Sequence, residues 1–201
     1  MGGSSSTVIG RPRGFDTDQA LERAMEVFWA RGYEGASLSD LTAAMGINKT
    51  SMYAAFGNKE QLFRKALSRY AEGPAAYAIH ALAEPTAREV AEALLRGAVR
   101  TTTLPGSPAG CLTVQGALAS SAGGRPAYDV LVAWRNDASQ RLTERFQRAV
   151  DEGDLPRDTD AQQLARYVMT LNFGIAVQAA NGLGHDDLQQ IADTALRNWR
   201  P

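Results

Sequence analysis

Residues 37–62 read SLSDLTAAMGINKTSMYAAFGNKEQL, and this stretch decides the fold. Ser37 and Asp40 have the spacing of a capping box. In that motif the hydroxyl accepts an amide N–H of the first helical turn, while the acidic side chain reaches back to the cap. The sequence therefore predicts a short helix over residues 38–45.

A tight turn and a second short helix follow directly. Gly46 stops the first helix, because glycine readily adopts the left-handed conformation that such turns need. Asn48 is a favourable cap for a second helix over residues 49–56. Leu41 and Ile47 are expected to face inward and to hold the two helices at their angle.

One helix precedes this pair and another follows it. Apolar residues at helical spacing predict a helix that is capped by Asp16 or Thr17 and ends at Gly32. Asn58 caps a longer helix after the pair. Two short helices joined by a tight turn and braced on both sides form a helix-turn-helix, whose second helix enters the major groove of DNA. An ordinary helical hairpin is the alternative interpretation of residues 37–59.

The outer face of the second helix is the surface that DNA would meet. Serine and threonine can bond to phosphates or base edges, and alanine can touch a thymine methyl group. Tyr53 can donate its hydroxyl to a phosphate. Lys59 opposes the dipole of the next helix, which suits a lysine that holds phosphate. The outer face comprises Lys49, Thr50, Ser51, Tyr53, Ala54 and Ala55, and the expected scaffold comprises Leu41, Gly46, Ile47, Asn48 and Phe56.

Residues 32–41 and 46–62 resemble the DNA-binding domain of the TetR family of bacterial regulators. The pattern Tyr-x-x-Phe-x-x-Lys-Glu-x-Leu, from Tyr53 to Leu62, is the specific signature. The strong resemblance covers residues 11–70. Beyond them, the length of the chain and its helical character also fit the family.

The resemblance implies a homodimer that reads two half-sites of a palindromic operator in double-stranded DNA. It also implies an inducer cavity and a dimer interface in the C-terminal part. Transferred to this chain, the family's phosphate contacts are Ser37, Tyr53 and Lys59, and its base contacts are Lys49, Thr50, Ser51 and Ala54. Arg11 and Arg13 are either a basic arm near the minor groove or part of a solvated tail.

The whole chain is expected to be all-α, with about nine helices. Residues 1–10 are interpreted as a flexible tail, 11–71 as a three-helix DNA-binding domain containing the helix-turn-helix at 37–56, and 72–201 as a larger helical domain for ligand binding and dimerisation. Apolar spacing and capping motifs predict the helices of the larger domain. They are expected at 75–83, 87–103, 112–121, 126–152, 160–181 and 187–199.

The distribution of charge agrees with a DNA-binding N-terminal part. Residues 1–70 carry nine Lys or Arg and seven Asp or Glu, a net charge of +2, whereas the remainder carries twelve and fifteen, a net charge of −3. The sign is the one expected if only the N-terminal part meets phosphate. The net charge of the whole chain is −1. This disfavours an architectural protein that binds DNA without specificity, because such binding depends on positive charge that meets the phosphates.

Several other classes of protein are disfavoured. No apolar run approaches the roughly 18 residues of a membrane span, and the first nine residues lack the features of a secretory signal. A single cysteine, Cys111, excludes an internal disulfide and fits a cytoplasmic setting. We find no Gly-rich phosphate loop, HExxH motif or nucleophile elbow. We therefore expect no enzyme, no cofactor, no metal and no membrane partner.

Candidate ligand and dimer residues lie in the C-terminal part. Aromatic and polar residues amid apolar runs could line a cavity, although plain core packing is the alternative for each. Cys111 begins a helix, where a thiol can become reactive, or it is a small buried residue. The candidate cavity residues are Cys111, Gln115, Trp134, Met169, Asn172 and Phe173. The candidate dimer residues are Leu188, Ile191, Ala195 and Trp199 on the last helix.

Overall fold

The computed structural model describes residues 14–116 and 121–199, and within these ranges it contains ten helices and no strand. They are α1 (Thr17–Gly35), α2 (Leu38–Met45), α3 (Lys49–Phe56), α4 (Lys59–Glu72), α5 (Tyr77–Ala81), α6 (Ala87–Thr102), α7 (Leu112–Gln115), α8 (Arg125–Glu152), α9 (Ala161–Ala180) and α10 (His185–Arg197). The all-α prediction is confirmed. The structure has one helix more than the expected total of about nine, and each of the ten corresponds to a range expected to be helical.

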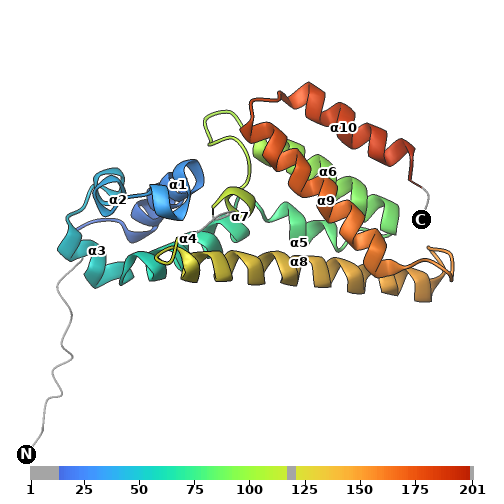
Figure 1. The fold of residues 1–201 in the computed structure, drawn as a ribbon, viewed down its shortest axis with the longest axis horizontal. Helices are drawn as coiled ribbons and strands as arrows, with labels where there is room; N and C mark the ends of the chain where they lie inside the picture. Colours follow the sequence, from blue (N-terminus) through green and yellow to red (C-terminus); the bar gives the residue numbers. More distant parts are fainter. Residues whose placement is uncertain (1–13, 117–120, 200–201) are drawn as a thin grey trace, which may run out of the picture.

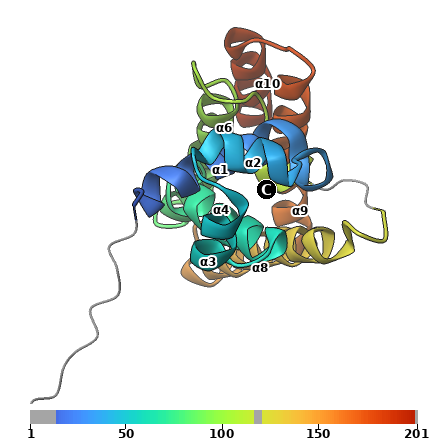
Figure 2. The same ribbon diagram turned by 90° about the vertical axis from the view of Figure 1, so that its left-hand side faces the viewer.

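The helices form two groups linked by α4 and α8. Helices α1–α3 gather at one end, while α6, α9 and α10 lie together at the other end (Figure 1). The end-on view in Figure 2 shows α3 and α2 on the outer side of the first group. None of the helices in the described ranges is long and apolar enough to span a membrane.

Local capping sets the bounds of α1. The Asp16 carboxylate accepts hydrogen bonds from the amides of Asp18 at 2.9 Å and Gln19 at 3.1 Å. Gly32, at φ 68° and ψ 177°, breaks the regular helix. The expected end at Gly32 therefore becomes a kink, because a further turn continues to Gly35 beyond it.

An aromatic cluster joins α1 to α4. Phe28 and Phe63 meet edge to face with their ring centroids 5.0 Å apart, and Tyr33 lies 5.2 Å from Phe63. All three side chains are buried. Leu41 of α2 and Met52 of α3 complete this core, so the two short helices are held against a rigid pair of longer ones.

The N-terminal core continues into the C-terminal part of the chain. It includes Leu112 and Leu131, which follow the proposed division at residues 71 and 72. The indole N–H of Trp29 donates to the carbonyl of Gly110 at 3.0 Å. The amide of Tyr33 donates to the carbonyl of Gly116, also at 3.0 Å. The end of α1 is thus bonded directly to the segment that contains α7.

Two expected helices are shorter than the sequence indicates. The helix expected over 75–83 is limited to Tyr77–Ala81. The helix expected over 112–121 ends at Gln115, and the carbonyl of the next residue, Gly116, accepts a hydrogen bond from the Tyr33 amide of α1. Residues 117–120 lie outside the described residues, as do the expected tail 1–10 and the arm containing Arg11 and Arg13. The other four helices of this part agree with their expected bounds to within two residues.

Candidate DNA-binding surface and ligand cavity

The turn between α2 and α3 has the geometry of a Schellman motif. Gly46 lies at φ 68° and ψ 28°, in the left-handed region. Its amide donates to the carbonyl of Ala43 at 3.2 Å, and the amide of Ile47 donates to that of Thr42 at 3.1 Å. These two bonds satisfy carbonyls at the end of α2. The turn is therefore fixed by backbone bonds and by one glycine.

The capping box at the start of α2 is present, and it engages Ser37 fully. The Ser37 hydroxyl donates to the Asp40 carboxylate at 2.6 Å and accepts from the Asp40 amide at 3.0 Å. Arg31 of α1 contacts the same carboxylate at 2.8 Å. Hydrogen bonding from Ser37, followed by Arg31, lowers the pKa of Asp40. The Ser37 hydroxyl could donate to a phosphate only if it gave up its hydrogen bond to the Asp40 carboxylate.

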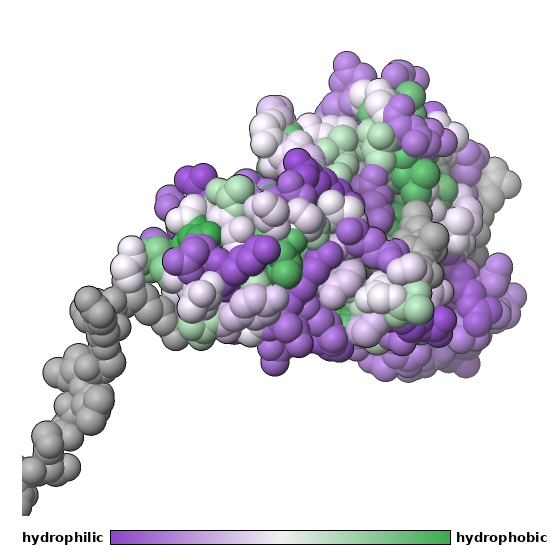
Figure 3. Space-filling view, turned by 60° about the vertical axis from the view of Figure 1, so that its left-hand side comes forward, coloured by the Kyte–Doolittle hydropathy of each residue, from purple (hydrophilic) through white to green (hydrophobic). Residues whose placement is uncertain are grey.

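Helix α3 presents a polar outer face because its inner face is anchored. The Asn48 side chain accepts from the Ser51 amide at 2.8 Å, which fixes the start of the helix. Met52 and Phe56 are buried. Lys49, Thr50 and Ala54 are consequently exposed, as is Tyr53, at 47%. The surface of this end of the molecule is largely hydrophilic with small apolar patches (Figure 3).

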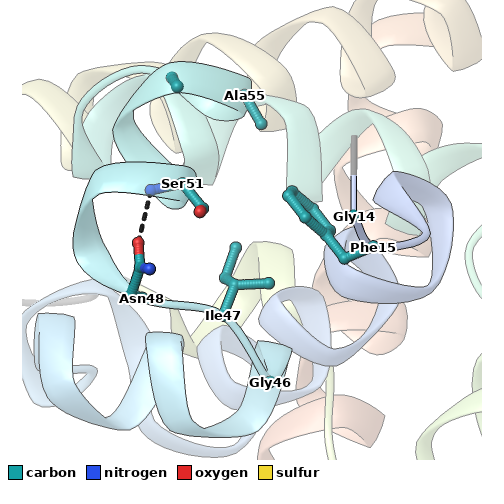
Figure 4. A pocket seen from close by; sticks show the side chains of 8 residues that line it. Gly14, Phe15, Gly46, Ile47, Asn48, Ser51 and Ala55 are labelled. Atoms are coloured by element: carbon teal, nitrogen blue, oxygen red, sulfur yellow. Dashed lines mark hydrogen bonds between the residues drawn. The ribbon is translucent and has the colours of Figure 1, made fainter. Parts of the chain in front are cut away.

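A shallow hollow separates α3 from the start of α1. Ser51 and Ala55 of α3 border it on one side and Phe15 on the other, with Ile47 between them (Figure 4). Ala54, an expected base contact, also lines it. Ile47 is half-buried against the core, so it both supports the turn and forms part of the wall.

Lys59 lies at the start of α4, beside the C-terminal end of α1. Its ammonium group is 4.5 Å from the centroid of the Tyr33 ring, a cation–π distance. Burial lowers the pKa of Lys59, and the charge of Glu34 opposes that shift. The side chain is half-buried, which limits the directions in which its ammonium can point.

A second lysine near α3 escapes the sequence analysis. The Lys65 ammonium donates to the carbonyl of Ala55 at 3.3 Å and lies 5.6 Å from the Phe56 ring. It therefore supports the C-terminal end of α3. No local motif indicates this contact, because the two partners are ten residues apart and belong to different helices.

The C-terminal part encloses a cavity of about 50 Å³, called here the central cavity. Five of the six candidate residues line it, namely Cys111, Trp134, Met169, Asn172 and Phe173. Gln115 does not. Its side-chain amide lies against Gly110, where an added Cβ would come within 2.2 Å of it. Tyr77, an aromatic residue expected as a possible cavity residue, also lines it, and Thr113 and Arg135, which no sequence pattern indicates, complete the polar part of the wall.

Cys111 is half-buried and hydrogen bonded within this wall. Its sulfur accepts from the Tyr70 hydroxyl at 3.3 Å and lies 3.0 Å from the Thr113 hydroxyl oxygen. Tyr70 is the last buried residue of α4. Burial raises the pKa of Tyr70, so its hydroxyl remains protonated and able to donate. The thiol thus connects the cavity wall to α4.

The four candidate dimer residues do not share one environment. Ile191 is 37% exposed and Ala195 half-buried, and both line an open groove between α9 and α10. Leu188 is fully buried, because it packs on α6 and α9 of its own chain. The expectation that Leu188 faces a partner is therefore wrong. Trp199 is half-buried and packs against Phe146 at 6.1 Å between ring centroids.

The described residues contain no group of three His, Cys, Asp or Glu side chains that could hold a metal ion. The positions that carry chemistry are instead the exposed face of α3 and the central cavity. A helix-turn-helix on a helical body with a cavity defines the class of DNA-binding transcriptional regulators.

The chain belongs to the tetR family of bacterial regulatory proteins. Residues 20–66 match the family's N-terminal DNA-binding domain. Residues 87–196 match the tetracyclin repressor-like C-terminal domain. The protein is accordingly a DNA-binding transcriptional repressor of this family, which is non-enzymatic.

Similar proteins cover the chain almost end to end. The repressor ComR of Escherichia coli is 35% identical over 194 residues, which are 94% of this chain and 91% of ComR. The repressor BdcR of the same organism is 29% identical over 94% of this chain and 90% of BdcR. A cysteine-substituted form of CifR, solved with 26-bp operator DNA, is 44% identical, with a TM-score of 0.90 over 95% of this chain and all of that one.

Proposed function

We propose that this protein binds a palindromic operator as a homodimer in the bacterial cytoplasm and is released from it by a small molecule. The exposed face of α3 carries the proposal, because it offers Lys49, Thr50 and Ala54 to the major groove beside Tyr53. The operator-bound CifR structure, at 44% identity, supports the same mode of binding here.

The proposed contacts with DNA are of two kinds, to base edges and to phosphates. Lys49, Thr50, Ser51 and Ala54 are proposed to meet base edges, because their side chains are exposed or line the hollow beside α3. Tyr53 and Lys59 are proposed to bind phosphates, which fix the register without carrying sequence information. Ser37 joins them only if phosphate replaces Asp40 as the acceptor of its proton.

The groove between α9 and α10 supports the homodimer. Apolar side chains are exposed along it, including Tyr167 at 47% and Ile191 at 37%. An exposed apolar strip rimmed by polar residues is typical of an interface. A two-fold pairing of this strip would give the dimer two copies of the helix-turn-helix, one for each half-site of a palindromic operator.

Release is proposed to begin at the central cavity and to reach α3 through two connections. One is the hydrogen bond from Tyr70 of α4 to Cys111. The other runs through α1, where Trp29 and Tyr33 bond to the segment on either side of α7. The Glu34 carboxylate also accepts hydrogen bonds from Ser121 and lies near Lys59. A ligand that favours another position of α4 and α7 would therefore weaken the affinity for DNA. The loss of affinity is limited by the difference between the ligand's affinities for the DNA-binding conformation and for the released one.

A matched pair of isoleucine substitutions tests the dimer. Ile191→Glu should make the protein monomeric in analytical ultracentrifugation and weaken its binding to upstream DNA about a hundredfold or more, because each half-site is then bound alone. Ile79→Glu is the control, since Ile79 is 57% exposed on α5 and lies outside the groove. A dimeric Ile191→Glu protein with unchanged DNA affinity would exclude this interface.

A non-specific architectural protein would behave differently from this sequence-specific regulator. It would bind DNA through phosphate contacts alone, so the identity of the residues on α3 would not affect which sequences are preferred.

A further inference from the structure

Arg135 is the unusual charged group of the central cavity. Three arginines of the described residues are not exposed: Arg96, Arg135 and Arg145. Arg96 contacts the carboxylates of Glu92 and Asp193, and Arg145 donates to three backbone carbonyls. Among the described residues, Arg135 makes one hydrogen bond, from Nη1 to the carbonyl of Thr113 at 2.6 Å. Within the described ranges no carboxylate lies in ion-pair distance of it.

The environment of this guanidinium group favours an added anion. Burial lowers the pKa of Arg135, and only the nearby side chains of Tyr128 and Cys111 oppose that shift. A guanidinium group has five N–H donors in a fixed fork that matches a carboxylate. With one donor occupied by Thr113, the others remain to replace the hydration that burial removes.

The rest of the cavity wall suits an apolar body. Tyr77, Trp134 and Phe173 supply three aromatic side chains, and Leu94, Leu142 and Met169 supply aliphatic ones. Asn172 adds one polar feature, because its Oδ1 atom is buried without a hydrogen-bond partner in the described residues. A ligand that donates a hydrogen bond there would satisfy an acceptor that is costly to leave unpaired.

We propose that the small molecule is a compact carboxylate with an aromatic or short aliphatic body, and that Arg135 binds its carboxylate. This inference rests on the proposed function, since it names the chemical class of the inducer for that same cavity. At about 50 Å³ the cavity is far smaller than the roughly 300–1,000 Å³ of ordinary ligand pockets. The ligand must therefore be small, and the walls of the cavity must move to admit it. This movement links ligand binding to the displacement of α4 and α7.

Pairs of acids and amides test the charge preference directly. The probes are benzoate, phenylacetate and mandelate, each compared with its own amide by isothermal titration calorimetry on the full chain. At least one acid should bind about tenfold or more tightly than its amide, because a hydrogen bond to a charged group is the stronger kind. Arg135→Gln should remove this preference, while a shorter N–H donor toward Thr113 is kept. Arg135→Lys should keep part of it.

A control on the same helix excludes a general effect of charge. Arg141→Gln removes an arginine of α8 that pairs with Asp137 on the exposed surface, and it should leave the acid-to-amide ratio unchanged. The proposal is overturned if no acid binds better than its amide, or if Arg135→Gln binds the acids as wild type does. Circular dichroism would show whether Arg135→Gln unfolds. In that case Arg135→Lys is the deciding variant: a retained preference for acids over amides supports the proposal, and a lost preference overturns it.

DNA release is measured separately, so that two failures can be told apart. If the amides bind and release upstream DNA just as effectively as the acids do, the proposed function stands but the carboxylate class of the inducer is refuted. Acids that bind through Arg135 without releasing DNA would support the carboxylate site and refute the inducer role of the cavity.

Discussion

Lys59→Ala is expected to weaken binding to every DNA sequence by a similar factor, on the order of tenfold to a hundredfold at physiological salt. The ammonium group lies beside the C-terminal end of α1 and over Tyr33, where it can hold a phosphate next to α3. One contact in each half-site is lost, so two are lost per dimer. The slope of log affinity against log salt concentration should therefore fall by roughly 1.8, at about 0.9 per phosphate contact.

Fluorescence anisotropy over a series of salt concentrations measures both quantities. Arg141→Ala is a suitable control, because that residue lies on α8 and is paired with Asp137 away from α3. An unchanged salt slope for Lys59→Ala would show that the ammonium group does not meet phosphate. A changed preference among sequences would assign Lys59 to base reading instead.

Arg145→Ala is expected to have the largest effect on stability. The side chain is only 5% exposed and donates to the carbonyls of Leu82, Glu84 and Pro85 at 3.2, 2.7 and 2.9 Å. It thereby holds the loop between α5 and α6 against α8. Its removal leaves those carbonyls without their charged donor, and the free energy of unfolding should fall by about 3 kcal/mol or more.

Urea denaturation of Arg145→Ala and Arg148→Ala gives the comparison. Arg148 lies on the same helix, is exposed and contacts Glu152 at 3.6 Å. Such surface pairs contribute about 0–1 kcal/mol, so Arg148→Ala should change stability little. Equal effects of the two substitutions would contradict the role given to the buried arginine.

The helix-turn-helix could be predicted because its determinants are local. The caps of Ser37 and Asn48 and the turn at Gly46 depend on bonds that span five residues or fewer. Such bonds are visible as residue types at fixed spacing. The start of α4 at Asn58 follows the same rule, since the Gln61 amide and the Asn58 side chain are three residues apart.

The connections between the two halves could not be predicted in this way. Trp29 and Gly110 are 81 residues apart, and neither residue type indicates the other. Arg135 and Arg145 lie on one helix whose other arginines form surface pairs, so the sequence alone does not distinguish the half-buried Arg135 or the buried Arg145 from them. Their roles depend on which face of α8 the rest of the chain covers.

The phase of a helix was the main source of error in the C-terminal part. Leu188 and Ile191 belong to one apolar stripe, and the sequence does not show which of them faces the chain's own core. Gln115 lies at the end of a single helical turn, which is too short for periodicity to orient a side chain. The candidates on the long helices α8 and α9, namely Trp134, Met169, Asn172 and Phe173, line the central cavity, whereas Gln115 of α7 does not.

Competition binding measures whether α3 reads a particular DNA sequence. A labelled duplex from the region upstream of the protein's own gene is displaced either by the same unlabelled duplex or by a scrambled duplex of equal composition. The upstream duplex should be preferred by about a thousandfold or more at physiological salt, and Lys49→Ala and Thr50→Ala should each change which sequences are preferred. Equal displacement by the two duplexes would contradict sequence-specific reading by α3, if operators elsewhere are also ruled out by genomic selection of bound fragments.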